Sequence, residues 1–280
     1  MIKENYFYEH LPFDELNPSY ILHRQCTIDS AHSFAAHWHE SIELLYLFEG
    51  ECDVMIDTER FHMSRRDVVC VNSGRIHSIS SAGFTQYSAL IVSPEFLREC
   101  GFPAETMLKP FISYADDQTV ADGIRLANRE GKYCRPYWQS VQKAAVVSLL
   151  CHLYRSYAVG GSGKKPISAA GSNVVKESLT YIRAHYHEDV STQELADRVG
   201  VTVNHLCACF KKVTGMSVKK YVNSMRCRDA EAMLFSGEYT VAEAGARCGF
   251  NNMPYFAKVY RSVVGMLPSD TLSEGKHAAG

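Results

Sequence analysis

Hydrophobic residues in the first third of the chain occur in short runs that polar and glycine-containing turns separate. Four such runs lie at 42–48, 52–56, 67–71 and 87–92. Glu49-Gly50 follows the first run, Asn72-Ser73-Gly74 follows the third, and Pro94 comes shortly after the fourth. Many short strands with regular turns are typical of a sandwiched or closed β domain. We therefore predict a small β-barrel over roughly the first 90 residues.

The spacing of hydrophobic residues then becomes helical. Val120, Ile124 and Ala127 recur at three- and four-residue intervals and predict a helix over 120–130, and a longer run predicts another over 137–158. Residues 161–172 are rich in glycine and serine, as flexible linkers are. The pattern predicts an α+β protein of two domains. Residues 1–160 form a β-barrel with following helices, and residues 173–275 form an all-helical domain.

The helical region contains one pattern twice, at 191–216 and at 240–266. The second copy has one inserted residue after the glycine of its turn. The matched pairs are Glu194 with Glu243, Arg198 with Arg247, Gly200 with Gly249, Thr202 with Asn252, Leu206 with Phe256, Phe210 with Tyr260 and Gly215 with Gly265. A match of this length indicates an internal repeat.

Each copy predicts two helices joined by a tight turn. Gly200 and Gly249 stand where the first helix must end, because glycine adopts a left-handed conformation at little cost. Thr202 and Asn252 are favourable N-caps for the second helix. The second helices each predict one buried stripe, formed by Leu206, Phe210 and Val213 and by Phe256, Tyr260 and Val263. The opposite face of each second helix is left free.

This region resembles the DNA-binding domain of the AraC/XylS family of bacterial transcription activators. The family features are Glu194-Leu195-Ala196, Phe210-Lys211-Lys212 followed by Gly215, Arg226-x-x-x-Ala230 in a linker helix, and Gly249-Phe250. The resemblance implies that the second helix of each copy enters the major groove of double-stranded DNA. A helical bundle without a DNA role is the alternative.

The resemblance also implies which side chains face DNA. The candidates are Val203, Asn204, His205, Cys207, Ala208, Lys211 and Lys212 in the first copy and Asn252, Met253, Pro254, Lys258 and Arg261 in the second. Cys207 and Ala208 are too short for bidentate bonds to a base, where arginine or glutamine is frequent in the family. We therefore expect an unusual target sequence that leans toward A·T pairs. Gly245 in the first helix of the second copy is expected to weaken that helix by about 1 kcal/mol.

The predicted barrel carries a second resemblance, to the cupin sensor domain found in many AraC-type regulators. It rests on His37-x-His39-x-x-x-Glu43 followed by Gly50, and on Asn72-x-Gly74-x-x-His77. Asn72 replaces the usual proline of the second motif, and Arg66 replaces its usual glycine. In metal-binding cupins, three histidines and a glutamate at these positions bind one divalent ion.

Two interpretations of these residues remain open. His37, His39, Glu43 and His77 could bind a divalent transition metal such as zinc, iron, nickel or manganese. They could instead form a metal-free polar pocket for a small molecule, which is the alternative that we favour at this point. His32 and Trp38 could line the mouth of either pocket or serve only in packing.

Charge and cysteine content add modest support. Residues 1–160 hold 14 Lys and Arg and 20 Asp and Glu, a net charge of −6, whereas residues 161–280 hold 15 and 11, a net charge of +4. A basic C-terminal half suits phosphate contacts. The ten cysteines show no CxxC pair and are typical of buried residues in a reducing cytosol. The N-terminus lacks a signal peptide and no apolar run would span a bilayer, so a cytoplasmic location is expected.

The sequence therefore predicts a DNA-binding transcription regulator that responds to a small-molecule effector, a sugar among the classes considered. We expect no catalytic residue. The expected partners are DNA, the effector, a second copy of the chain and, for an activator, RNA polymerase. Dimerisation is expected through the 137–158 helix or a barrel edge, although these helices could merely cover the barrel. The alternatives are a metal-dependent cupin oxygenase or isomerase tethered to DNA, and an architectural DNA-binding protein.

Overall fold

The computed structural model describes residues 20–29, 34–159 and 169–279. The chain divides near residue 165 into two compact units, a sheet-rich one before and a helical one after, and we describe strand β2 with the sheet in which it pairs. The α+β class and the order of the two parts agree with the prediction. No helix within the described ranges has the length and hydrophobicity that crossing a bilayer requires.

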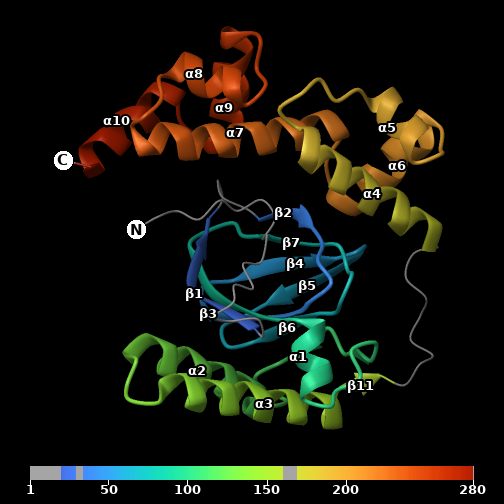
Figure 1. The fold of residues 1–280 in the computed structure, drawn as a ribbon, viewed down its shortest axis with the longest axis vertical. Coiled ribbons are helices and arrows are strands. Elements are labelled where there is room, and N and C mark those ends of the chain that lie inside the picture. Colours follow the sequence, from blue (N-terminus) through green and yellow to red (C-terminus); the bar gives the residue numbers. More distant parts are fainter. Residues whose placement is uncertain (1–19, 30–33, 160–168, 280) are drawn as a thin grey trace. The chain divides into compact units, whose positions relative to one another are not determined.

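The sheet-rich unit contains two antiparallel sheets that form the predicted barrel (Figure 1). The five-stranded sheet has the order β1 (Tyr20–Ile28), β8 (Thr85–Val92), β3 (Ile42–Glu49), β6 (Val68–Val71) and β10 (Phe111–Ile112). The four-stranded sheet has the order β2 (Phe34–His37), β7 (His77–Ser80), β4 (Cys52–Ile56) and β5 (Glu59–Met63). The four predicted strands are all present. A third, two-stranded sheet pairs β9 (Met107–Leu108) with β11 (Ala158–Val159).

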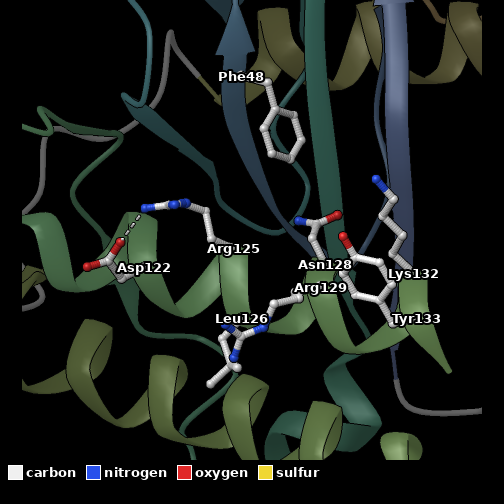
Figure 2. Close-up of a pocket in the computed structure, with 8 residues that line it drawn as sticks. All are labelled: Phe48, Asp122, Arg125, Leu126, Asn128, Arg129, Lys132 and Tyr133. Carbon is white, nitrogen blue, oxygen red and sulfur yellow. Dashed lines mark hydrogen bonds and ion pairs between the residues drawn. The ribbon is translucent and has the colours of Figure 1, made fainter. Parts of the chain in front are cut away.

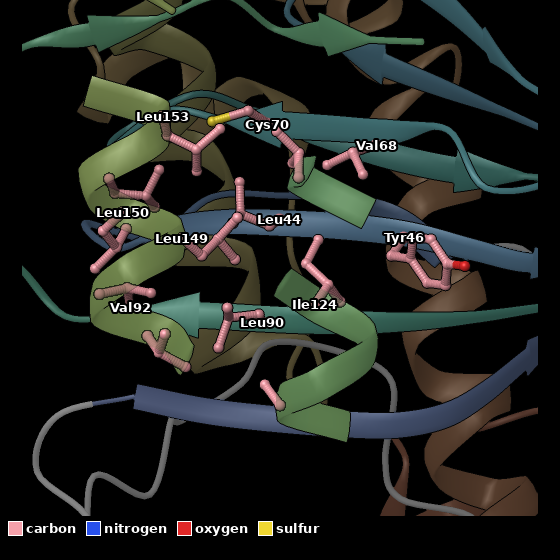
Figure 3. Packing of buried hydrophobic residues seen from close by; sticks show 14 of the residues in the cluster. Leu44, Tyr46, Val68, Cys70, Leu90, Val92, Ile124, Leu149, Leu150 and Leu153 are labelled. Carbon is pink, nitrogen blue, oxygen red and sulfur yellow. The ribbon is translucent and has the colours of Figure 1, made fainter. Parts of the chain in front are cut away.

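Helices cover one face of the five-stranded sheet. They are α1 (Pro94–Glu99), α2 (Gln118–Tyr133) and α3 (Trp138–Ser156), and Figure 1 shows α2 and α3 running side by side. Side chains of a strand point alternately to its two faces. On β3, Leu44 and Tyr46 join Leu90, Leu149 and other residues in the core between sheet and helices, which Figure 3 shows. Glu43 and Leu45 therefore belong to the opposite face of β3.

The helical unit contains seven helices among the described residues. They are α4 (Ala169–His185), α5 (Thr192–Arg198), α6 (Val203–Thr214), α7 (Val218–Ser236), α8 (Val241–Arg247), α9 (Met253–Val264) and α10 (Pro268–Ala279). Figure 1 shows α7 connecting one cluster, α4 to α6, with a second cluster, α8 to α10. Leu234, Phe256 and Tyr260 are fully buried between α7 and α9.

Two boundaries differ from the prediction. Residues 169–172, which we assigned to the linker at 161–172, form the first turn of α4. Alanine at 169 and 170 favours helix strongly, which the glycine and serine around them concealed in the sequence. The helical domain also continues beyond residue 275, because α10 ends at Ala279. Residues 161–168 of the predicted linker, together with His32, lie outside the described residues.

Candidate DNA interface and sensor site

The two copies of the repeat fold as predicted, because each helix begins at a residue that caps it. Ser191 accepts a hydrogen bond from the Glu194 amide at the start of α5. Thr240 accepts one from the Glu243 amide at the start of α8, and the Glu243 carboxylate accepts the Thr240 amide at 2.8 Å in return. This reciprocal capping box satisfies two amides that a helix start would otherwise leave unpaired.

The second helices are capped in the same way. The Thr202 hydroxyl accepts the His205 amide at 3.3 Å, and the Asn252 side chain accepts the Tyr255 amide at 2.8 Å. The preceding turns pass through Gly200 with φ of 69° and Gly249 with φ of 86°. Both glycines therefore adopt the left-handed backbone that the sequence predicted for them.

Each second helix buries one stripe and exposes the other. Leu206, Phe210 and Val213 are buried on α6, and Phe256 and Tyr260 are fully buried on α9. Val264 completes the stripe of α9, whereas the predicted Val263 is only half-buried. The stripe therefore ends one position later than its counterpart in α6.

Most residues predicted to face DNA lie on the surface, whereas Met253 packs against the hydrophobic core. Val203 and Met253 are half-buried, and the others are exposed. The exposed residues are Asn204, His205, Cys207, Ala208, Lys211 and Lys212 on α6, the N-cap Asn252, and Pro254, Lys258 and Arg261 on α9. Some of these side chains already have partners. The side-chain oxygen of Asn252 accepts the capping hydrogen bond, and the His205 Nε2 atom lies 3.5 Å from the Cys209 sulfur. Pro254 occupies the first turn of α9, where its missing N–H costs nothing.

Two residues beside this surface escaped the sequence analysis. The Tyr255 hydroxyl accepts a hydrogen bond from the Asn223 side-chain amide of α7 at 2.8 Å, and Tyr255 is 38% exposed. The Lys219 ammonium lies 5.7 Å from the centre of that ring. Because Lys219 starts the linker helix while Tyr255 belongs to the second copy, only the fold brings them together. The sequence signal that could have identified Lys219 was the basic, exposed start of the linker helix.

The turn that follows α4 connects the two copies. The Arg226 guanidinium of α7 donates to the carbonyls of Tyr186 and Glu188, both at 2.6 Å. The Tyr186 hydroxyl donates to the Asp229 carboxylate of α7. A Cβ on Gly249 would stand 2.4 Å from the carbonyl oxygen of His187. The family feature Arg226-x-x-x-Ala230 thus holds residues 186–188, which press against the turn of the second copy.

In the sheet-rich unit, the four predicted sensor residues come together. One ligand atom from each of His37, His39, Glu43 and His77 can be chosen so that all lie within 4.8 Å of one another. Glu43 Oε2 lies 3.2 Å from His39 Nε2 and 2.8 Å from His77 Nε2. His39, Glu43 and His77 are buried, and His37 is half-buried. We call these four residues the histidine cluster.

Backbone carbonyls fix the orientation of the three imidazoles. His37 Nδ1 lies 2.9 Å from the Ala35 carbonyl, His39 Nδ1 lies 3.1 Å from that of Ser41, and His77 Nδ1 lies 3.1 Å from that of Arg75. A carbonyl oxygen only accepts, so each Nδ1 carries the proton. In neutral imidazoles Nε2 then offers a lone pair, and two of these face a carboxylate oxygen.

Glu43 is negatively charged in this setting. Burial alone would raise the pKa of its carboxyl, but the hydrogen bonds and charges that His39 and His77 supply when they are protonated hold that pKa well below its ordinary value. A carboxylate beside lone pairs needs a cation between them, which is either a proton on the imidazoles or a metal ion. Metal-bound histidines almost always donate their second N–H to a carbonyl or carboxylate, as all three do here. The donor set therefore fits a divalent transition metal.

The structure explains both departures from the cupin pattern. Asn72, in place of proline, donates to the Leu108 carbonyl at 2.9 Å and accepts the Leu108 amide at 2.8 Å, so it attaches β9 to the barrel. Arg66, in place of glycine, keeps the left-handed backbone with φ of 76°. Its guanidinium donates to the Tyr114 hydroxyl at 3.1 Å. Trp38 is half-buried next to the histidine cluster in sequence.

Comparisons with known proteins agree with these two parts. A family model described as an AraC-like ligand binding domain matches residues 18–129, and one described as a helix-turn-helix domain matches residues 195–274. The HTH-type transcriptional regulator YdeC of Bacillus subtilis is 22% identical over 243 residues, which cover 83% of this chain and 84% of YdeC. The melibiose operon regulatory protein of Escherichia coli K12 is 20% identical over 256 residues, covering 83% of this chain and 82% of that protein.

A solved structure shows the same fold. ToxT from Vibrio cholerae O395 aligns with a TM-score of 0.50 and 12% identity, covering 92% of this chain and 98% of ToxT. The two family matches together cover most of the chain, in the same order as the two units of the structure. The chain belongs to the AraC family, as a DNA-binding transcription regulator with an N-terminal domain that responds to a small molecule.

Proposed function

We propose that α6 and α9 are the two recognition helices of this regulator and that each enters the major groove with its exposed face. The supporting observation is that the two helices bury equivalent stripes and leave every predicted contact residue except Val203 and Met253 exposed. Two such helices on one face of a duplex must lie about one turn, roughly 34 Å, apart. The 19 residues of α7 give a connecting helix of about 28 Å, which is compatible with that spacing.

Titration of DNA into the full chain tests this proposal. Lys258→Ala should weaken binding to the preferred site by about 1–3 kcal/mol if Lys258 contacts a base. Lys212→Ala should weaken all sequences alike and lower the slope of affinity against salt by about 1. Lys109→Ala, an exposed lysine of the sheet-rich unit, is the control and should change neither quantity. Absence of DNA binding at low salt would contradict the proposal.

We also propose that the histidine cluster is the effector site and that it holds a divalent transition metal. The support is that His39 and His77 turn Nε2 toward the Glu43 carboxylate, at 3.2 and 2.8 Å, while a backbone carbonyl holds the Nδ1 atom of all three histidines. His37, His39, Glu43 and His77 would hold the ion. A bound ion would supply open coordination positions for oxygen atoms of a polar effector. Hydroxyl-rich molecules such as sugars are the first class to test, and one relative is named for a melibiose operon.

Elemental analysis of protein purified without an affinity tag distinguishes the two interpretations of the cluster. Near-stoichiometric zinc, iron, nickel or manganese that Glu43→Gln removes is the expected result. Glu49→Gln, at the exposed end of the same strand, is the matched control and should retain the metal. If the protein contains no transition metal and a chelator leaves its melting temperature unchanged, the metal-free pocket is the better interpretation.

Dimerisation through α3 is a further part of this proposal. Tyr137 is 83% exposed and Val141 is 42% exposed at the start of that helix, and Tyr133 at the end of α2 is 59% exposed. Hydrophobic side chains grouped in this way often mark an interface between proteins. Sedimentation of the full chain should give a dimer that Tyr137→Glu with Val141→Glu converts to monomer. A wild-type monomer at tens of micromolar would exclude a stable dimer.

The relatives are named as transcription regulators, which agrees with a sensor rather than an enzyme. We therefore propose that the histidine cluster binds its ligand without converting it. Conversion of a stabilising ligand by the purified chain would instead support a cupin enzyme. Transcription in vitro with RNA polymerase and the bound promoter would decide between activation and repression.

A further inference from the structure

An open cavity of about 900 Å³ lies between strand β3 and helix α2, outside the barrel interior. Figure 2 shows Phe48 extending from the strand toward side chains that rise from α2, with Asn128, Lys132 and Tyr133 grouped at one end. Phe48 follows Leu44 and Tyr46 on the face of β3 that meets the helices, whereas Glu43 belongs to the other face. The cavity and the histidine cluster therefore occupy opposite sides of one sheet.

The lining of this cavity is positively charged. Arg125, Arg129 and Lys132 line it and Asp122 is the acidic member, which leaves a net charge of +2. These basic residues follow helical spacing of four and three, so they share one side of α2 and extend over about 10 Å. The domain around them is acidic, with a net charge of −6 over residues 1–160. The cavity thus concentrates positive charge in the acidic half of the chain, outside the helical unit to which we assign the DNA contacts.

The basic residues are only partly neutralised. Arg125 donates to the Asp122 carboxylate at 3.0 Å, but both side chains are at least half exposed, and a guanidinium keeps further N–H donors. Arg129 lies 3.7 Å from Glu130, a longer contact. Among the described residues, no carboxylate lies within ion-pair distance of Lys132, whose ammonium stands 5.5 Å from the Tyr133 ring centre.

Asn128 supplies an independent observation. Its side-chain amide donates to the Ser88 hydroxyl at 3.1 Å and to the Ile124 carbonyl at 3.0 Å, which fixes its orientation. Its Oδ1 atom is buried and accepts no hydrogen bond from the described residues, although the residue is only 8% exposed and lines the cavity. A buried acceptor without a donor is costly. A ligand with an N–H or O–H group would satisfy it.

We propose that this cavity is a second ligand site, which binds a small phosphorylated metabolite. A phosphoryl group carries up to two negative charges and three acceptor oxygens, so it can bond to arginine and lysine side chains spread over about 10 Å. A single carboxylate offers less charge and fewer oxygens to such a set of residues. The organic part would contact Phe48 and Tyr133 and donate a hydrogen bond to Asn128. A volume of this size accommodates such a molecule. The proposal is independent of the function that we assign to the histidine cluster.

Equilibrium dialysis of the full chain tests it with two probes, adenosine monophosphate and glucose 6-phosphate. At least one should bind saturably, with one molecule per chain, at least tenfold more tightly than inorganic phosphate and than its own dephosphorylated form. Arg125→Gln and Lys132→Ala should each weaken binding about tenfold. Arg98→Gln is the matched control, because Arg98 forms the same kind of exposed pair with Glu95 three residues away, at 2.8 Å, outside the cavity.

Two further variants sharpen the result. Asn128→Asp should weaken the probe at least as much as the surface variants, because it adds a buried negative charge to the lining of a cavity whose ligand is an anion. If the Asn128→Asp variant does not fold, Arg125→Gln and Lys132→Ala decide the question. Glu43→Gln should leave probe binding unchanged, which separates this site from the histidine cluster. The proposal is overturned if neither probe binds at 10 mM or if both surface variants retain full affinity. It is also overturned if inorganic phosphate binds as tightly as the probes, because the cavity would then hold an adventitious ion only.

Discussion

The two glycines of the repeat should respond very differently to the same substitution. Gly200 and Gly249 occupy equivalent turns and both have a left-handed backbone, with φ of 69° and 86°. A Cβ on Gly200 would meet no atom within 4 Å, whereas one on Gly249 would meet the His187 carbonyl oxygen at 2.4 Å and its carbon at 2.9 Å. The repeat therefore contains its own control.

The expected magnitudes follow from these contacts. Gly200→Ala should lower the free energy of unfolding by about 1–2 kcal/mol, which is the cost of a left-handed alanine. Gly249→Ala carries the same cost together with a collision against backbone, and overpacking typically adds about 1–3 kcal/mol. Asparagine tolerates the left-handed conformation, so Gly200→Asn should be close to wild type. Gly249→Asn should remain destabilised because its Cβ collides in the same place.

Denaturant unfolding can resolve this difference in the full chain. Both tryptophans, Trp38 and Trp138, precede residue 160, so their fluorescence follows the sheet-rich unit. Far-ultraviolet circular dichroism also follows the helical unit, and the transition that appears only in circular dichroism is the one to compare. If Gly249→Ala costs no more than Gly200→Ala, the turn of the second copy does not press against His187, and our account of how the two copies are held together is wrong.

Three further predictions concern other named contacts. Arg226→Ala should destabilise the helical unit by about 2–4 kcal/mol, because it removes two charge-assisted hydrogen bonds to the backbone carbonyls after α4. Unfolding followed by circular dichroism would measure this loss, and Arg226→Lys should recover part of it. Burial would raise the pKa of Asp117, but its bonds to His152, the Thr119 amide and Tyr157 lower that pKa to about 2. The ionised Asp117 carboxylate therefore stabilises the fold above about pH 4, and this stabilisation is lost as the pH falls toward 2. Asp117→Asn should lower the free energy of unfolding by about 1–2 kcal/mol at pH 7 and by little at pH 2. An equal loss at both pH values in tryptophan-monitored unfolding would contradict this. Arg66→Gly should be more stable than Arg66→Ala by about 1 kcal/mol in the same assay, because only alanine retains the left-handed cost, and equal stabilities would show that φ at this position relaxes.

The repeat was predictable because its signals are local. An N-cap such as Thr202 or Asn252 bonds to an amide three residues away, and a left-handed glycine ends the helix beside it. Such features depend on neighbouring residues and can be recognised without knowing the fold. The strands of the barrel were predictable for the same reason, since alternation and turn residues are visible in single segments.

Contacts between distant segments were not predictable. We expected Gly245 to weaken α8, but a Cβ there would stand 2.9 Å from the fully buried Phe256 ring, so glycine permits α8 and α9 to approach closely. The cost in helix propensity is thus offset by packing that only the fold brings about. The cavity beside α2 was missed likewise, because Phe48 and Asn128 are far apart in sequence and neither belongs to a motif.

The histidine cluster shows where a correct motif leaves the chemistry undecided. The spacing of His37, His39 and Glu43 placed these groups together, yet it contained no information on which nitrogen of each ring points inward. That choice is made by three backbone carbonyls, each two residues from the histidine that it binds. They hold Nδ1–H outward, so in the neutral imidazoles the Nε2 lone pairs of His39 and His77 face the Glu43 carboxylate. Because lone pairs and a carboxylate repel one another, the arrangement favours a bound cation. This is why we now prefer the metal to the metal-free pocket that the sequence favoured.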